Sequence, residues 1–286
     1  MVRAVRGELF KALRRPSVWV CIVALVLLAV LISYVLVGYV YSHPPKGATA
    51  GLPKGTTLAD FLPTLYPANF VRETLGTWGD LGGVFALIIG VLLQGSEYGW
   101  GTVKMLFTQR AGRFTMLAGK LITLAVVLLL MVLALFAATA AASFAVASLE
   151  GADTSFPAVD VIAKGIGTCF LVYGLWSLIG LTLATLFRQS AMAIGLGLAY
   201  GLVIERTVFG LLGLGGGDWV NQIHQWFPMA NVGYLVASFG EVRIRGVGAT
   251  AAPYADATHG VIILVIYLAA FVAITLGISR ARDVTS

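Results

Sequence analysis

Charged residues are scarce in this sequence. Only 11% of its 286 residues are Asp, Glu, Lys or Arg, and 59% are hydrophobic, whereas soluble domains carry roughly 25% charged residues. A soluble protein of this length needs a polar surface over its core, and a disordered chain needs low hydrophobicity. With a mean hydropathy of +0.92, the chain is therefore expected to be an integral membrane protein with several helical spans.

Cysteine and proline are also few. Cys21 and Cys169 both lie in apolar runs, so the sequence indicates neither a disulfide framework nor a cysteine metal site, and we expect two buried thiols. The nine prolines lie outside the long uncharged runs or at their edges. Because proline removes a helix hydrogen bond, this distribution favours uninterrupted helices.

Catalytic motifs are missing. The three histidines, His43, His224 and His259, lie far apart, and there is no HExxH, no GxSxG and no pair of acids within an apolar run. The one Gly-Lys dipeptide, Gly119-Lys120, follows Phe114 where a Walker A loop requires glycine. We expect no enzymatic activity and no metal or cofactor bound by this chain.

Six uncharged runs are present instead. About 20 apolar residues cross a bilayer at 1.5 Å per residue, so four runs are long enough alone, and polar flanks complete the second and fifth. The sequence predicts an all-α integral membrane protein with six transmembrane helices in a single domain, 1–286. The runs are 16–45, 81–96, 121–149, 165–187, 189–204 and 257–279.

The few charges predict the orientation. With the N-terminus in the cytoplasm, the inner segments hold 12 of the 19 basic residues against three acidic ones. Their net charge is then +9 and that of the outer segments is −3, which recovers the total of +6. The positive-inside rule therefore favours both termini in the cytoplasm. The basic excess serves topology, so no nucleic-acid partner is expected.

Residues 1–15 have the pattern of an amphipathic interfacial helix. Val2, Val5, Leu9 and Leu13 share a helical stripe, and the basic residues, which include Arg14 and Arg15, lie largely off it. Pro16 disfavours helix at the residue before it, so the chain should bend before entering the bilayer. Such a segment lies among lipid headgroups; a plain positive-inside anchor is the alternative.

The loop 96–117 is the most informative predicted cytoplasmic segment. Thr102 can cap a short helix over 103–108 that exposes apolar residues between basic ones. We expect this loop either to dock on a partner protein or to lie on lipid headgroups. The candidate docking residues are Glu97, Gly101, Thr102, Lys104, Met105, Leu106, Phe107, Arg110 and Arg113.

Three charges fall close to the predicted outer membrane surface: Asp80, Glu205 and Arg206. Ionisable groups at membrane depth are candidates for function, but at the interface they would be solvated or paired. The apolar stretch 207–217 is too short to span, so within the outer segment 205–258 we expect a re-entrant or interfacial piece. Two small-residue motifs, 79–83 and 197–201, suit close helix packing within the chain or between copies.

Together these features resemble the ABC-2-type permeases, the six-span membrane subunits of bacterial ABC exporters for drugs and peptide antibiotics. The resemblance rests on GELFKALRRPSVWV at 7–20, on the Glu97 to Thr102 element with GRFTMLAGK at 112–120, and on the segment around Pro228 before the last helix. It covers essentially the whole chain. The stretch Gln109–Gly112 departs from the family, which commonly has a proline there.

The resemblance implies a bacterial inner-membrane protein that pairs with a second permease copy, or a related one, and with two ABC ATPase subunits. ATP and Mg²⁺ would bind those subunits, the loop 96–117 would carry a coupling helix, and Arg14 and Arg15 would hold the elbow helix. A hydrophobic or amphipathic substrate (drug, peptide antibiotic or lipid) would be exported. The alternatives are an ATP-independent secondary transporter or channel and a non-transporting sensor or assembly subunit.

Overall fold

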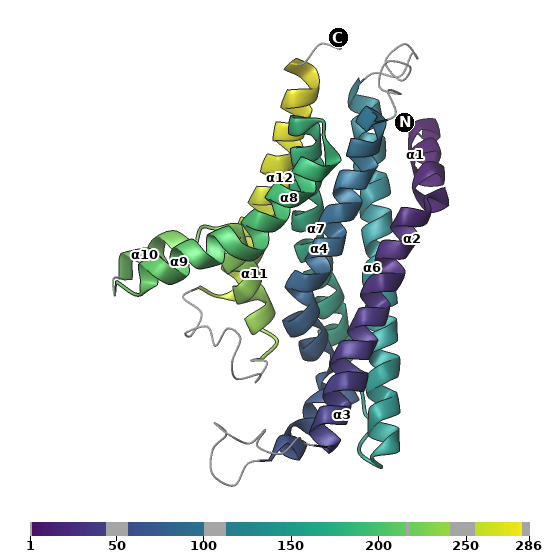
Figure 1. The fold of residues 1–286 in the computed structure, drawn as a ribbon, viewed down its shortest axis with the longest axis vertical. Helices are drawn as coiled ribbons and strands as arrows, with labels where there is room; N and C mark the ends of the chain where they lie inside the picture. The colour runs from purple at the N-terminus through teal and green to yellow at the C-terminus, as the bar shows by residue number, and fades with distance from the viewer. Residues whose placement is uncertain (1, 44–56, 100–112, 216–217, 241–254, 282–286) are drawn as a thin grey trace.

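The computed structural model describes residues 2–43, 57–99, 113–215, 218–240 and 255–281. Within these ranges all the regular secondary structure is helical, and there is no strand. Six helices are long and apolar enough to cross a membrane, which confirms the predicted count. They form an upright bundle in which α1 and the last turns of the C-terminal helix lie at the same end (Figure 1). The orientation of the bundle in the membrane stays a prediction.

The N-terminal bend is confirmed. Helix α1 (Val2–Arg14) ends before Arg15, which has an extended backbone with ψ of 118°, and α2 (Pro16–Leu28) begins with the proline. The indole nitrogen of Trp19 donates to the carbonyl of Leu13 at 2.7 Å, which ties the two helices across the bend. Helix α1 packs against the neighbouring α6 (Arg113–Leu149).

The first span is continuous but not regular. The π-helix η1 (Ala29–Leu36) separates α2 from α3 (Val37–Ser42), so the absence of proline did not produce an uninterrupted α-helix. π-Helical turns are rare and frequently mark functional sites. Here the segment turns Ser33 and Tyr34 into the protein, where both are buried.

The second span is much longer than the predicted run 81–96. After the 3₁₀-helices η2 (Leu58–Leu65) and η3 (Pro67–Asn69), helix α4 runs over Phe70–Gly99. Its N-terminal part includes Glu73 and Asp80. The predicted run began after Asp80 because that charge was taken for the end of the apolar segment, whereas the helix extends further and buries Glu73 against its neighbours.

The central helices follow with short connections. Helix α7 (Val159–Phe187) ends at Arg188, whose φ of 53° is left-handed, and α8 (Ser190–Leu198) begins two residues later, as the short predicted link requires. Helix α8 continues through the π-helix η4 (Ala199–Ile204) into α9 (Glu205–Gly213). The helix therefore does not end near residue 204, and 207–213 continue it as part of α9. The re-entrant or interfacial placement of this piece stays a prediction.

A helical hairpin and the last span complete the fold. Helices α10 (Asp218–His224) and α11 (Pro228–Ala237) precede α12 (Ala257–Ala281). Figure 1 shows α9 and α10 projecting sideways from the bundle, with α11 returning toward it. Pro228, around which one of the segments that carry the resemblance lies, is the first residue of α11.

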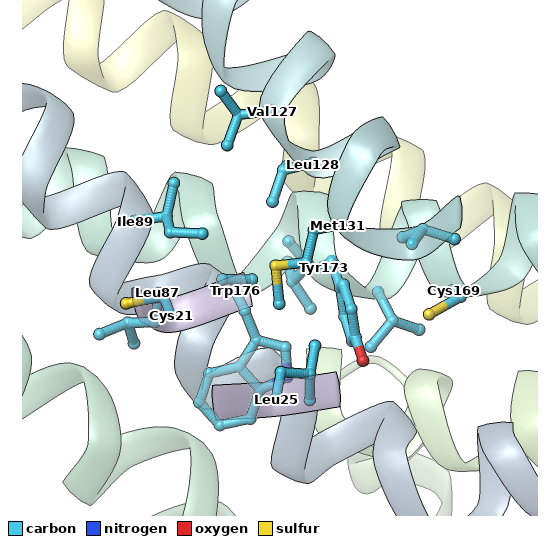
Figure 2. Close-up of a cluster of buried hydrophobic side chains, with 14 of the residues drawn as sticks. Cys21, Leu25, Leu87, Ile89, Val127, Leu128, Met131, Cys169, Tyr173 and Trp176 are labelled. Carbon is cyan, nitrogen blue, oxygen red and sulfur yellow. The ribbon is translucent and has the colours of Figure 1, made fainter. Parts of the chain in front are cut away.

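Helices α4 and α7 form the centre of the bundle, where their backbones touch. A Cβ atom at Gly90 would overlap the carbonyl oxygen of Ser177, and one at Gly180 would overlap that of Leu87. Tyr173 and Trp176 of α7 are fully buried among side chains of neighbouring helices (Figure 2). Bulk added to a helix here would therefore force the backbones apart.

The small-residue motifs serve this internal packing. A Cβ at Gly83 or at Gly201 would overlap the indole ring of Trp176, and one at Gly197 would overlap Leu87. Of the two explanations left open by the sequence, close packing within the chain accounts for these three glycines.

Candidate functional site

The predicted docking loop is shorter than expected. Helix α4 continues to Gly99 and α6 begins at Arg113, so Glu97 is in the last turn of α4 and Arg113 is the first residue of α6, where 96–117 had been expected to be loop. The other candidates lie outside the described residues: Gly101, Thr102, Lys104, Met105, Leu106, Phe107 and Arg110.

A buried polar contact joins the two helices that flank this loop. The Lys120 Nζ atom of α6 donates to the Gln94 Oε1 atom of α4 at 2.9 Å, and both side chains are buried. A buried ammonium group needs polar partners to offset its lost hydration. The contact therefore fixes α4 and α6 together one to two turns from the loop.

The elbow arginines have different roles. Arg15 Nη1 donates to the carbonyl oxygen of Leu92 at 2.9 Å, so it holds the bend after α1 against α4. Arg14 instead lies over the ring of Phe10 within α1, at 4.5 Å from its centroid. Ala12 is completely buried. The structure thus places Arg15 at the junction of α1 with the bundle and Arg14 on the exposed side of α1.

At the other end of α4, the predicted charges Asp80 and Arg206 meet as an ion pair between α4 and α9. The Asp80 side chain is 27% exposed and that of Arg206 is 51% exposed. They were predicted to be either functional or paired at the interface, and they are paired. The contact attaches the sideways-projecting α9 to the bundle.

Glu205 is buried next to this pair. Its side chain accepts hydrogen bonds from the Tyr200 hydroxyl and from the backbone nitrogen of Ala230, each at 3.0 Å. Ala230 is in the first turn of α11, where unpaired N–H groups and the helix dipole favour a carboxylate. His224 Nε2 lies 3.6 Å from the same carboxylate. Glu205 therefore caps α11, a role that excludes free solvation at an interface.

Aromatic and backbone contacts hold the rest of the hairpin. The ring of Phe209 on α9 stacks on His224, with centroids 4.3 Å apart. From α12, the Tyr267 hydroxyl donates to the carbonyl of Trp226 at 3.1 Å, and a ring nitrogen of His259 lies 3.2 Å from the carbonyl oxygen of Gln225. These contacts make α9, α10, α11 and α12 one connected unit.

Residues 77–285 match the family model described as "Protein of unknown function (DUF2705)". The chain belongs to the DUF2705 family. No curated protein matches it. The matched range starts in α4 and contains both Asp80 and the Glu205 region, so the ion pair and the capped hairpin belong to the DUF2705 part of the chain.

The structure adds a residue that the sequence did not single out, Glu73, just before the DUF2705 match. Glu73 is only 6% exposed, and the described part of the chain offers it one hydrogen bond, from the Thr77 hydroxyl at 3.0 Å. A helical stripe of Phe70, Thr74 and Trp78, all buried, was the signal that the second span begins before residue 81.

No metal centre is indicated in the parts of the chain that the structure describes. His, Cys, Asp and Glu side chains there do not gather in groups of three that could hold an ion. The described residues do place charged side chains at three defined positions. Arg15 lies at the junction of α1 with the bundle, Glu205 at the first turn of α11 and Glu73 near the start of α4.

Proposed function

We propose that this chain is the permease subunit of an ATP-driven ABC exporter in a bacterial inner membrane. It would act with two copies of a separate ATPase, which bind ATP and Mg²⁺, and with a second permease. The observation that carries the proposal is the contact from Arg15 to the Leu92 carbonyl. It places an amphipathic helix next to the end of α4 that leads into the basic loop 100–112.

Direct helix contacts connect this end of the bundle to its centre. Helix α4 runs from the loop to the close backbone contacts with α7 at Gly90 and Gly180, and Lys120 joins it to α6. Packed helices move as rigid bodies. A partner that shifts the loop would therefore shift α4, α6 and α7 together, and a hydrophobic or amphipathic substrate would pass between two permeases.

Coupling would be the task of the loop and its flanks. Met105, Leu106 and Phe107 would be apolar anchors for the ATPase. The charged and capping residues around them, Glu97, Gly101, Thr102, Lys104, Arg110 and Arg113, would transmit its movement.

Purification tests this proposal. The chain expressed with the products of neighbouring genes should co-purify with an ATPase, and ATP hydrolysis should depend on that partner. Phe107→Ala and Glu97→Ala should reduce the amount of ATPase recovered, while Phe144→Ala, at an exposed position on α6, should not. Full recovery with both loop variants would exclude the coupling role of this loop.

A second candidate is an ATP-independent secondary transporter. Its support is the buried carboxylate of Glu73 in a membrane-spanning helix, because such groups often bind transported ions or protons. Transport by the purified chain alone in liposomes would favour it, and transport that requires the ATPase and ATP would exclude it.

A further inference from the structure

Helix α10 and the turn that follows it present side chains on three faces. One face packs on the protein: Val220 is 2% exposed, and the ring of His224 stacks on Phe209 of α9. The second face is apolar, and each of its side chains is about half exposed: Trp219, Ile223 and Trp226. The third face is polar and consists of Asp218, Asn221, Gln222 and Gln225. The protein therefore covers only part of the apolar surface of this helix.

The spacing of these residues separates the faces. The turn keeps a helical path toward Trp226, since the backbone nitrogen of Gln225 donates to the carbonyl of Asn221 at 3.1 Å. Successive residues of a helix are about 100° apart, so positions 219, 223 and 226 share one side, and positions 218, 221, 222 and 225 share another. Helix α10 is thus amphipathic, and an exposed apolar strip adjoins the face that packs on the protein.

Contacts with α12 show where α10 lies along the bundle. A ring nitrogen of His259 lies 3.2 Å from the carbonyl oxygen of Gln225, and the rings of Trp226 and His259 meet edge to face with centroids 5.3 Å apart. His259 belongs to the first turn of the last span. About 20 residues cross the apolar core of a bilayer, and counting about 20 positions back from Arg280, the first basic residue after this apolar run, reaches the position after His259. Trp226 therefore lies at the level of a membrane boundary.

Exposed apolar side chains also occur on α9, which forms the end of the fifth span. Val208, Leu211 and Leu212 are exposed there. Figure 1 shows α9 and α10 projecting sideways from the bundle. Both projecting helices thus expose apolar side chains at a level where lipid surrounds a membrane protein, and exposed apolar patches mark sites of membrane or protein interaction.

The composition of the strip on α10 favours lipid as its partner. Tryptophan combines an apolar ring with a polar N–H group and is enriched at the level of lipid headgroups. Residues 218–227 contain no Lys or Arg, so insertion would depend on apolar burial and not on anionic lipid. With the strip turned into the bilayer, the polar face of α10 is directed toward water.

We propose that α10 is an interfacial anchor, which inserts Trp219, Ile223 and Trp226 into the boundary between headgroups and acyl chains of the leaflet farther from α1. Glu205 holds the first turn of α11, and Tyr267 donates to the carbonyl of Trp226. The anchor would therefore fix the hairpin of α10 and α11 at the membrane surface, beside the fifth and sixth spans. This inference does not depend on the proposed export function.

Spin labels on the full chain in phosphatidylcholine nanodiscs test the anchor. In a chain with Cys21 and Cys169 replaced by alanine, labels at Ile223→Cys and at Asn221→Cys report the two sides of α10. Oxygen, which concentrates in lipid, should relax the label at Ile223→Cys more than a water-soluble nickel chelate does, and the order should reverse at Asn221→Cys. Leu130→Cys, at an exposed position within the span of α6, is the lipid-facing reference.

Two results would overturn the proposal. Stronger relaxation by nickel than by oxygen at Ile223→Cys would place the strip in water. Weak relaxation by both reagents would show that protein, such as a second copy of this chain, covers the strip.

Removing the two indole rings tests their role in the anchor. In the Ile223→Cys chain, Trp219→Ser together with Trp226→Ser should lower the relaxation of the label by oxygen roughly twofold or more and raise that by nickel, because apolar burial holds an interfacial helix in place. Phe144→Ser, at an exposed position on α6, should leave both unchanged. Unchanged relaxation in the double variant would contradict the insertion of these tryptophans.

Discussion

Arg206 on α9 and Asp80 on α4 form an ion pair although 126 positions separate them in the chain. The preceding residue, Glu205, accepts a hydrogen bond from the first turn of α11. Two consecutive residues of α9 thus hold it to the bundle on one side and to the hairpin on the other. The charges that interrupt the fifth apolar run therefore attach α9 to α4 and to the hairpin of α10 and α11.

Breaking the Asp80–Arg206 pair should destabilise the protein modestly. Because both side chains are partly exposed, we expect Asp80→Asn or Arg206→Gln to cost about 1–2 kcal/mol. The measurement is the thermal unfolding midpoint of the purified protein in detergent. The double substitution should cost less than the sum of the two single ones, and additive losses would show that the pair contributes no coupling energy.

Removing the Glu205 carboxylate should loosen α11 first. Glu205→Ala leaves the Ala230 N–H and the Tyr200 hydroxyl without an acceptor, at a cost of about 1–3 kcal/mol. Hydrogen exchange at the first turn of α11 should therefore accelerate roughly tenfold or more, with a smaller effect for Glu205→Gln, which keeps an acceptor oxygen. Glu150→Ala, at an exposed position after α6, is the control. Equal protection in wild type and Glu205→Ala would exclude the capping role.

A single methyl group added to a glycine at the contact between α4 and α7 should disrupt the fold. In Gly90→Ala the new Cβ meets the backbone carbonyl of Ser177, which cannot rotate away, so we expect a large loss of folded monomer in size-exclusion chromatography. Gly167→Ala on α7 has no atom within 4 Å of its Cβ, and its higher helix propensity should add up to about 1 kcal/mol. Similar yields for the two variants would mean that the helices can separate without cost.

Substitution of Arg14 and of Arg15 should have different effects on the mobility of α1. Arg15→Ala removes a charged hydrogen bond to Leu92, which is typically about 1.5–3 kcal/mol, and should release α1. A spin label at Gly7→Cys, an exposed position of α1 with no atom within 4 Å of its Cβ, should then become more mobile in a chain with Cys21 and Cys169 replaced by alanine. Arg14→Ala should change the mobility much less, because Arg14 contacts only the neighbouring turn of α1 in the described structure.

Hydropathy was sufficient for the number of spans and for the bend at Pro16, because both depend on local sequence. It failed at the ends of the second and fifth spans. Asp80, Glu205 and Arg206 were taken for the limits of the apolar runs, yet they lie inside the helices. All three have partners on elements distant in the sequence, which hydropathy cannot identify. Glu73, which the sequence did not single out, is buried by packing.

The π-helices were equally invisible in the sequence. Residues 29–36 and 199–204 are apolar and lack proline, so nothing in their composition separates them from an ordinary α-helix. The first buries Ser33 and Tyr34, and the second contributes Tyr200, whose hydroxyl donates to Glu205. The hydrogen bond from Tyr200 to Glu205 was therefore beyond a prediction that assumes a constant 3.6-residue period.

The wide turns of η4 set the angular register of everything after them. Each residue advances an α-helix by about 100°, so deleting one residue within Ala199–Ile204 would turn Glu205 and Arg206 away from both α11 and α4. The span would be one residue shorter but would stay long and apolar enough to insert. Its capacity to cross a membrane and the direction in which it presents its charges are thus separable properties of the same short segment.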